Sequence, residues 1–227
     1  MTRIAVLHTS PATVDVFGRL LRERLPEASV FNLLDDSILP ELRDNGADVA
    51  AVLPRWRTYA RVARDQGADV ILNACSSIGE LCEPVSREID IPIVRVDARM
   101  AREAALRGQR VAVVATLPST LRPTSDLVAQ TAKQLGREVD VTATVVDGAY
   151  ATLMAGDQAG HDDRVAEALR AACASADAVV LAQASMARVL PRLSDAERAK
   201  CLVSPPLAVE SVVEAVARLA ASRRIER

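Results

Sequence analysis

A strand pattern followed by a turn of small residues occurs twice in the chain, and this repetition constrains the fold more than any other feature. Arg3–Leu7 (RIAVL) and Arg110–Ala115 (RVAVVA) each lead into a turn rich in Thr, Ser and Pro. Asp69–Ser77 (DVILNACSS) and Ala178–Met186 (AVVLAQASM) form a second such pair. We therefore expect two α/β lobes related by duplication, with residues 1–97 and 207–227 in the first and 98–206 in the second.

Each lobe is expected to hold a mostly parallel sheet flanked by helices, because its strand patterns are continuous apolar runs. Aromatic residues make up only 2% of the chain against 50% hydrophobic residues, so the core must be built from Ala, Val, Leu and Ile. The expected strands include Ser29–Leu34 and Ala178–Leu181, and a clean amphipathic helix is expected over Asp162–Ala174. The turns of both lobes would line a cleft between them.

Charge and apolar patterning exclude several partner classes. A net charge of −2 gives no electrostatic basis for binding nucleic acid or an anionic membrane. No apolar run approaches the length of a membrane span. The N-terminus enters a strand directly and lacks the features of a signal peptide, so we expect a cytoplasmic protein with reduced thiols. The cysteines and histidines lack metal-ligand spacing, and no metal site is expected.

Cys75 is the strongest catalytic candidate. It follows a predicted buried strand and precedes a helical pattern, in which Ser76 or Ser77 is expected to be the N-cap and Ser77 has the capping-box spacing to Glu80. Open α/β sheets bind ligands at this edge, where free amides and the helix dipole favour an anion, including a thiolate. The alternative interpretation is that Cys75 is a small buried hydrophobic residue.

Polar residues in the neighbouring turns are candidate substrate ligands. Ser76 and Ser77 can hold a carboxylate or an enediolate, and Asn73 is expected to orient the turn. The duplicated turns offer further donors, although such residues also serve plain turns: these are Thr9, Ser10, Thr116, Ser119 and Thr120. Aligning Leu72 with Leu181 places Ala184 opposite Cys75, and it brings Gln183 and Ser185 to the corresponding turn of the second lobe.

The chain has two histidines, and they lead to different expectations. His8 ends the first predicted strand and is our candidate for a catalytic acid/base partner of Cys75, although a lone histidine is often structural. His161 lies in the segment AGHDD and is expected to be a solvated residue at a helix start.

The paired arrangement of Cys75 in NACSS, the two Thr/Ser turns and AQASM resembles the aspartate/glutamate racemase superfamily, which includes hydantoin racemases, maleate isomerases and arylmalonate decarboxylases. The resemblance spans nearly the whole chain. It implies two pseudo-symmetric lobes that enclose a small carboxylate substrate, no metal or organic cofactor, and a homo-oligomer. It also implies two facing cysteines, one removing the α-proton and the other delivering a proton to the opposite face.

The chain departs from that pattern, because the sequence alignment places Ala184 where the second cysteine is expected. The resemblance therefore implies a cofactor-independent isomerase or racemase acting at the α-carbon of a small carboxylic acid through Cys75. Two alternatives stay open. One is a decarboxylase or a cis–trans isomerase that uses a single thiol. The other is a homologue that binds a carboxylate without turnover.

Overall fold

Every strand pairing in the described part of the chain is parallel, and the strands form two four-stranded sheets of the same order. The computed structural model describes residues 1–225, with side chains described through residue 222. Residues 226 and 227, which end the expected first lobe, lie outside the described residues. The chain divides into two units, Met1–Val96 with Pro205–Arg227 and Asp97–Ser204. The expected two-lobe α/β class is confirmed.

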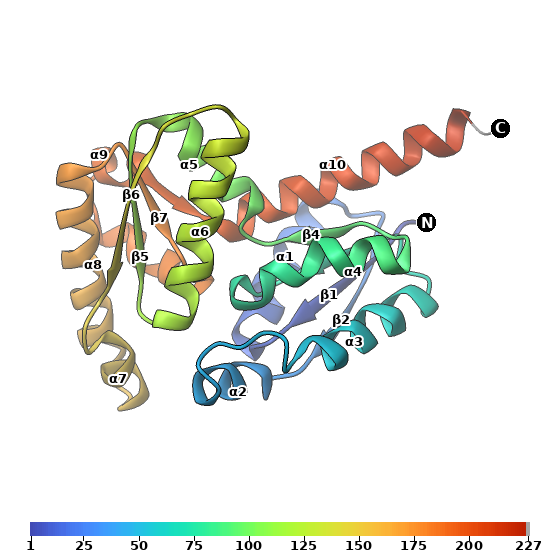
Figure 1. The fold of residues 1–227 in the computed structure, drawn as a ribbon, viewed down its shortest axis with the longest axis horizontal. Coiled ribbons are helices and arrows are strands. Elements are labelled where there is room, and N and C mark those ends of the chain that lie inside the picture. The colour runs from blue at the N-terminus through green and yellow to red at the C-terminus, as the bar shows by residue number, and fades with distance from the viewer. Residues whose placement is uncertain (226–227) are drawn as a thin grey trace. The chain divides into compact units, whose positions relative to one another are not determined.

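The sheet of the first unit has the order β2-β1-β3-β4 (Figure 1). Its strands are β1 (Arg3–His8), β2 (Ser29–Leu34), β3 (Val70–Asn73) and β4 (Ile93–Arg95). The helical segments of this unit are η1 (Pro11–Thr13), α1 (Val14–Arg24), α2 (Ile38–Asp44), α3 (Leu53–Asp65), η2 (Ser76–Leu81) and α4 (Cys82–Ile89), together with α10 (Ser204–Ile225), which returns from the second unit.

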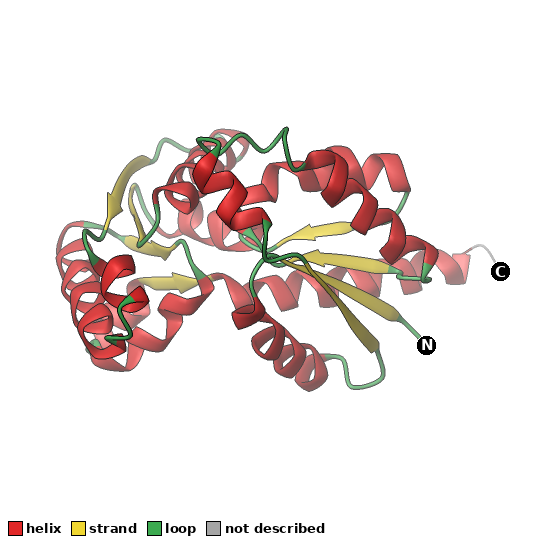
Figure 2. Cartoon of the chain, turned by 90° about the horizontal axis from the view of Figure 1, so that it is seen from below, coloured by secondary structure: helices red, strands yellow, loops and turns green. Residues whose placement is uncertain are grey.

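Helices cover both faces of this first sheet, and Figure 2 shows its strands as yellow arrows between helices. Alternate residues of β1 point to opposite faces, as the period of a strand requires. Ala5 and Leu7 pack with α2, α3 and α4, whereas Ile4 and Val6 pack with α1 and α10. A strand buried on both faces must be apolar throughout, and this explains the continuous runs in the sequence.

The second unit repeats the plan with the order β6-β5-β7-β8. Its strands are β5 (Arg110–Ala115), β6 (Asp140–Val145), β7 (Ala178–Leu181) and β8 (Cys201–Val203). Its helical segments are α5 (Ala98–Arg107), α6 (Pro118–Gln134), α7 (Ala149–Met154), α8 (Gln158–Ser175), η3 (Ala184–Arg192) and α9 (Asp195–Lys200). One face of the sheet packs on α8 and η3, and α5 and α6 contact β7 and β5.

The register of the two sheets corrects the alignment made from the sequence. The amide of Ala74 donates to Leu7 in the first unit, and Ala182 donates to Val114 at the matching place in the second, with both distances at 2.9 Å. Cys75 therefore corresponds to Gln183, and the expected match to Ala184 is wrong by one residue. Both residues have extended backbone and precede a 3-10 helix, which supports the equivalence.

Among the described residues, no helix is both long enough and apolar enough to cross a bilayer.

Candidate active site

Cys75 lies at the carboxyl edge of the first sheet, two residues after β3 ends. It directly precedes η2 and is only 6% exposed. The short strand Val70–Asn73 is fully buried and delivers the chain to this edge, where parallel sheets place their ligand sites. The sequence therefore predicted the place of Cys75 in the fold correctly.

Several donors surround the Cys75 sulfur. Burial raises the pKa of the thiol and is the largest effect on it. Hydrogen bonds from the Thr9 hydroxyl and from the backbone amides of Ser77 and Ile78 oppose burial and lower the pKa. The amides that were expected to favour a thiolate are thus present, but in the free protein burial outweighs them. These donors can stabilise negative charge that appears during a reaction.

The serines after Cys75 do not form the expected helix cap. The segment begins as the 3-10 helix η2 with Cys75 itself at the N-cap, and no side chain caps it. The prediction that Ser76 or Ser77 is the N-cap is therefore wrong. Ser77 is 3% exposed, and its hydroxyl is buried without a hydrogen bond of ordinary geometry within the described residues, although it lies close enough to Cys75 to lower the thiol pKa.

Asn73 shapes the turn from within the sheet. Its side-chain amide donates to the carbonyl of Cys75 at 2.9 Å, and the residue is fully buried. Its own Oδ1 has no partner among the described residues. Because this bond joins the strand end to the residue just before η2, Asn73 holds the turn that presents Cys75, in the way the sequence suggested.

In the turn after β1, Thr9 lies near the Cys75 sulfur, whereas Ser10 and Thr13 form hydrogen bonds within the turn itself. Ser10 caps η1, its hydroxyl accepting from the Ala12 amide at 3.4 Å. The Thr13 hydroxyl donates to the Ser10 carbonyl at 2.9 Å. Thr9 is 4% exposed, whereas Ser10 is partly exposed.

His8 points to the face of the sheet opposite the core that includes Cys75. Its ring lies 6.4 Å from that of Phe17, on the α1 side. Nδ1 is 2.7 Å from the Thr13 hydroxyl and Nε2 is 2.9 Å from Asn32 Oδ1, so both ring nitrogens are engaged. Burial lowers the His8 pKa, and the hydrogen bond to Asn32 only partly offsets this. The structure thus does not bring His8 together with Cys75.

The second unit repeats this geometry with an amide in place of the thiol. Gln183 Oε1 accepts from the Thr116 amide at 2.6 Å and from its hydroxyl at 2.9 Å. Thr116 corresponds to Thr9, just as Gln183 corresponds to Cys75. The structure therefore brings together two residues that the sequence suggested separately.

The other candidates of this unit lie in the flanking turns. The Thr120 hydroxyl donates to the carbonyl of Leu117 at 2.9 Å, as Thr13 does to Ser10 in the first unit. Ser119 is partly exposed, and Ser185 is exposed at the start of η3. Thr120 therefore closes its turn, and neither serine is tied to the Thr116–Gln183 pair by a hydrogen bond among the described residues.

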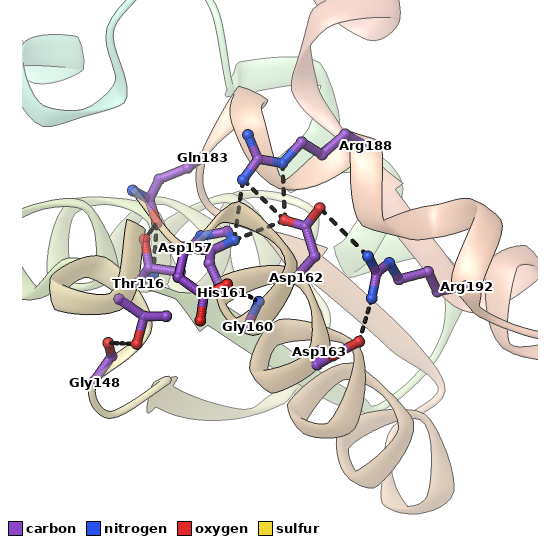
Figure 3. A network of polar contacts seen from close by, with 11 residues as sticks. Thr116, Gly148, Asp157, Gly160, His161, Asp162, Asp163, Gln183, Arg188 and Arg192 are labelled. Carbon is purple, nitrogen blue, oxygen red and sulfur yellow. Dashed lines mark hydrogen bonds and ion pairs between the residues drawn. The ribbon is translucent and has the colours of Figure 1, made fainter. Parts of the chain in front are cut away.

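A polar cluster of the second unit was missed from the sequence (Figure 3). His161 is 1% exposed, so the expectation of a solvated histidine is wrong. Its Nδ1 lies 2.8 Å from Asp162 Oδ1, and Arg188 Nε donates to the same oxygen at 2.9 Å. The four-residue spacing of His161, Val165 and Leu169 on α8 places the histidine on the buried stripe of the helix, and that spacing was the available signal.

A family model described as Asp/Glu/hydantoin racemase matches residues 4–220. The chain belongs to this family. A search among curated protein sequences finds no match.

Solved structures with this fold include racemases and a decarboxylase. A glutamate racemase isoform, RacE1, from Bacillus anthracis has 15% identity and a TM-score of 0.74 over 96% of this chain and 82% of its own. A putative Asp/Glu racemase from Yersinia pestis has 12% identity and a TM-score of 0.73 over 95% of this chain and 100% of its own. A cysteine-substituted mutant of arylmalonate decarboxylase, in a sulfate-associated form, has 19% identity and a TM-score of 0.59 over 95% and 93%.

Within the racemase family fold, the two units of this chain offer unequal chemistry at equivalent positions. Cys75 carries a thiol that can exchange a proton, whereas the Gln183 amide can only donate or accept hydrogen bonds. A symmetric pair of thiols at these two positions is therefore excluded by the sequence and the register together.

Proposed function

We propose that the protein is a cofactor-independent isomerase or racemase that acts at the α-carbon of a small carboxylic acid through Cys75. The observation that carries the proposal is the set of donors on the Cys75 sulfur, namely the Ser77 and Ile78 amides and the Thr9 hydroxyl. The family match and the racemase neighbours support the reaction class.

In the proposed step, the Cys75 thiolate takes the proton from the α-carbon and becomes a thiol. The electron pair of the broken C–H bond moves into the carboxyl group and forms an enediolate. The negative charge that the thiolate carried before the transfer is then carried by the enediolate oxygens of the substrate. Donors such as the Ser77 hydroxyl, which is buried and lacks an ordinary partner, can stabilise that charge.

Decarboxylation is the second candidate, and the raised pKa of Cys75 favours it. When CO2 leaves a malonate, the electron pair of the C–C bond forms the same enediolate, which then needs only a proton donor. A thiol that stays protonated at neutral pH suits that role. The decarboxylase among the structural neighbours supports this candidate.

The test is to incubate the protein with each enantiomer of aspartate and of glutamate, and with phenylmalonate. Chiral chromatography measures racemisation, and CO2 release measures decarboxylation. We expect turnover of at least one compound and a loss of at least about 10²-fold in Cys75→Ser, because a hydroxyl is a far weaker acid than a thiol.

The matched control is Cys82→Ser, which changes a second buried cysteine of the same unit. We expect it to retain the rate of the unchanged protein. Turnover of none of these compounds, or an unchanged rate in Cys75→Ser, would contradict the proposal and favour a carboxylate-binding protein without turnover.

A further inference from the structure

We propose that Cys173 and Cys201 of the second unit form a modification site, at which hydroperoxides convert a pair of thiols to an intrachain disulfide. Neither cysteine belongs to the candidate active site, so the inference stands or falls independently of the proposed function. Its support comes from the distance between the two sulfur atoms, from the contacts that hold the two backbones together, and from the placement of the thiol protons.

The two sulfur atoms lie side by side although the cysteines are 28 residues apart in the chain, with Sγ–Sγ at 3.9 Å. Cys173 is in the last turn of α8 and Cys201 begins β8, so the pair joins two elements of the same unit. Both are free thiols. Because a disulfide bond is about 2.05 Å long, the sulfurs must approach by about 2 Å more, a movement that rotation of the two side chains can supply.

Lys200 ties the two cysteines together through the backbone. Its Nζ donates to the carbonyl of Cys173 at 2.7 Å and to that of Ala176 at 3.0 Å. These carbonyls lie at the carboxyl end of α8, where a cation is favoured. Lys200 directly precedes Cys201 in the chain. The ammonium therefore binds the backbone of one cysteine from the position next to the other, and this limits how far the sulfurs can separate.

The hydrogen bonds of the pair determine where the thiol protons lie. Cys173 Sγ donates to the carbonyl of Glu197 at 3.6 Å. Since a carbonyl only accepts, the proton of Cys173 points away from Cys201, and the proton between the two sulfurs is assigned to Cys201. A lone pair of the Cys173 sulfur therefore faces Cys201, which is the orientation that attack on the Cys201 sulfur requires.

Exposure and charge determine which thiol is oxidised first. Cys173 is 4% exposed, whereas Cys201 is partly exposed, so a small peroxide reaches Cys201 more easily. Burial raises the pKa of both thiols, that of Cys201 to about 12, and the nearby Glu197 carboxylate raises both further. Lys200 opposes this rise at Cys173. Because thiolate is scarce at neutral pH, oxidation should be slow there and faster as the pH increases.

The proposed reaction balances with a hydroperoxide as the oxidant. The Cys201 thiolate attacks one peroxide oxygen, so that an S–O bond forms, the O–O bond breaks, and the leaving oxygen takes a proton as water or an alcohol. Cys173 then attacks the sulfur of the Cys201 sulfenic acid. The S–S bond forms and the S–O bond breaks, and the hydroxyl leaves as water with the Cys173 proton. Two electrons pass from the sulfurs to the peroxide.

The test maps disulfides in the full-length protein after treatment with hydrogen peroxide, in buffer and in urea. Trypsin cleaves after Arg170, Arg188 and Lys200, so the two cysteines fall on separate peptides. Mass spectrometry without reduction then identifies the linked pair. We expect the Cys173–Cys201 link to account for most of the intrachain disulfide in the folded protein and to disappear on reduction. In urea it should be one of several pairings of the four cysteines.

The matched control is Cys82→Ser, which removes a buried cysteine of the other unit and should keep the link. Cys173→Ser should lose it. Absence of the Cys173–Cys201 link in the folded protein, or the same mixture of pairings in buffer and in urea, would overturn the inference. Either result would leave the proposed function intact, because that function depends on Cys75.

A second measurement asks whether the native fold accommodates the bond. The disulfide would close a loop that contains β7 and Gln183, and such a loop restricts the unfolded chain. The urea midpoint followed by circular dichroism should therefore be higher in the peroxide-treated protein than after its reduction. Cys173→Ser, treated in the same way, should show no such difference. An equal or lower midpoint in the cross-linked protein would overturn the inference.

Discussion

At the scale of single residues, equivalent threonines of the two units bind different side chains. Thr9 donates to the thiol of Cys75, and Thr116 donates to the amide oxygen of Gln183. The backbone frame is the same in both units, because each threonine follows the first strand of its sheet. The two units therefore differ in chemistry because the residue that the threonine binds is Cys75 in one and Gln183 in the other, while the backbone fold is the same.

This pairing predicts the effect of removing the Thr9 hydroxyl. Thr9→Val keeps the shape of the side chain but removes a hydrogen bond that lowers the Cys75 pKa, so the pKa should rise further. The rate of alkylation of Cys75 by iodoacetamide, followed against pH, should shift to higher pH. Thr116→Val is the matched change in the second unit and should leave the Cys75 profile in place. An unchanged profile in Thr9→Val would contradict the assigned bond.

The sequence predicted the position in the fold of some candidate residues and not of others, for identifiable reasons. Cys75 was placed correctly because an apolar run ends just before it. The register of the second unit was misassigned because the runs DVIL and AVVL match almost equally well when shifted by one residue, whereas strand pairing fixes one register. His161 was expected to be solvated because its charged neighbours hide the buried stripe of α8.

At the scale of elements, strands bounded by turn residues were predicted well. Ser29–Leu34 and Ala178–Leu181 have the expected bounds. Helix α8 begins four residues before the expected Asp162, because Asp157 caps it by accepting from the Gly160 amide at 2.8 Å. Helix α9 was missed because it is short and polar.

Helix α9 nevertheless carries a complete capping box. The Ser194 hydroxyl accepts from the Glu197 amide, and Glu197 accepts from the Ser194 amide at 2.8 Å. Ser194→Ala should lower the free energy of unfolding by about 1 kcal/mol. Urea denaturation measures the change, with Ser222→Ala on an exposed helix face as the control. Equal stabilities of the two variants would show that the cap contributes nothing.

At the scale of the whole molecule, each unit has its own hydrophobic core. Leu72 is fully buried in a core of the first unit, and Leu169 is fully buried in that of the second. The single tryptophan, Trp56, is buried in the first unit. Its fluorescence therefore reports on the first unit alone, whereas far-ultraviolet circular dichroism reports on both.

Replacing one buried leucine by alanine in each unit should separate the fluorescence transition from the circular dichroism transition. Leu169→Ala should destabilise the second unit by about 2–5 kcal/mol, so the circular dichroism transition in urea should begin before the tryptophan transition. Leu72→Ala should instead shift the tryptophan transition to lower urea. Coincident transitions that move together in both variants would show that the chain unfolds as one cooperative body.

The two units of this chain share one fold, and at the equivalent positions after their third and seventh strands Cys75 carries a thiol whereas Gln183 carries an amide. We infer that Cys75 reacts in a site that holds a small carboxylate. Iodoacetate carries a carboxylate and iodoacetamide is its neutral analogue, so their relative rates at each cysteine measure this property.

Peptide mapping of the full-length protein gives the ratio of iodoacetate to iodoacetamide labelling at Cys75 and at Cys82. We expect the ratio at Cys75 to be higher in the folded protein than in urea, and we expect no such increase at Cys82. A folded-state ratio at Cys75 equal to or below that of the unfolded chain would contradict a carboxylate site at this cysteine.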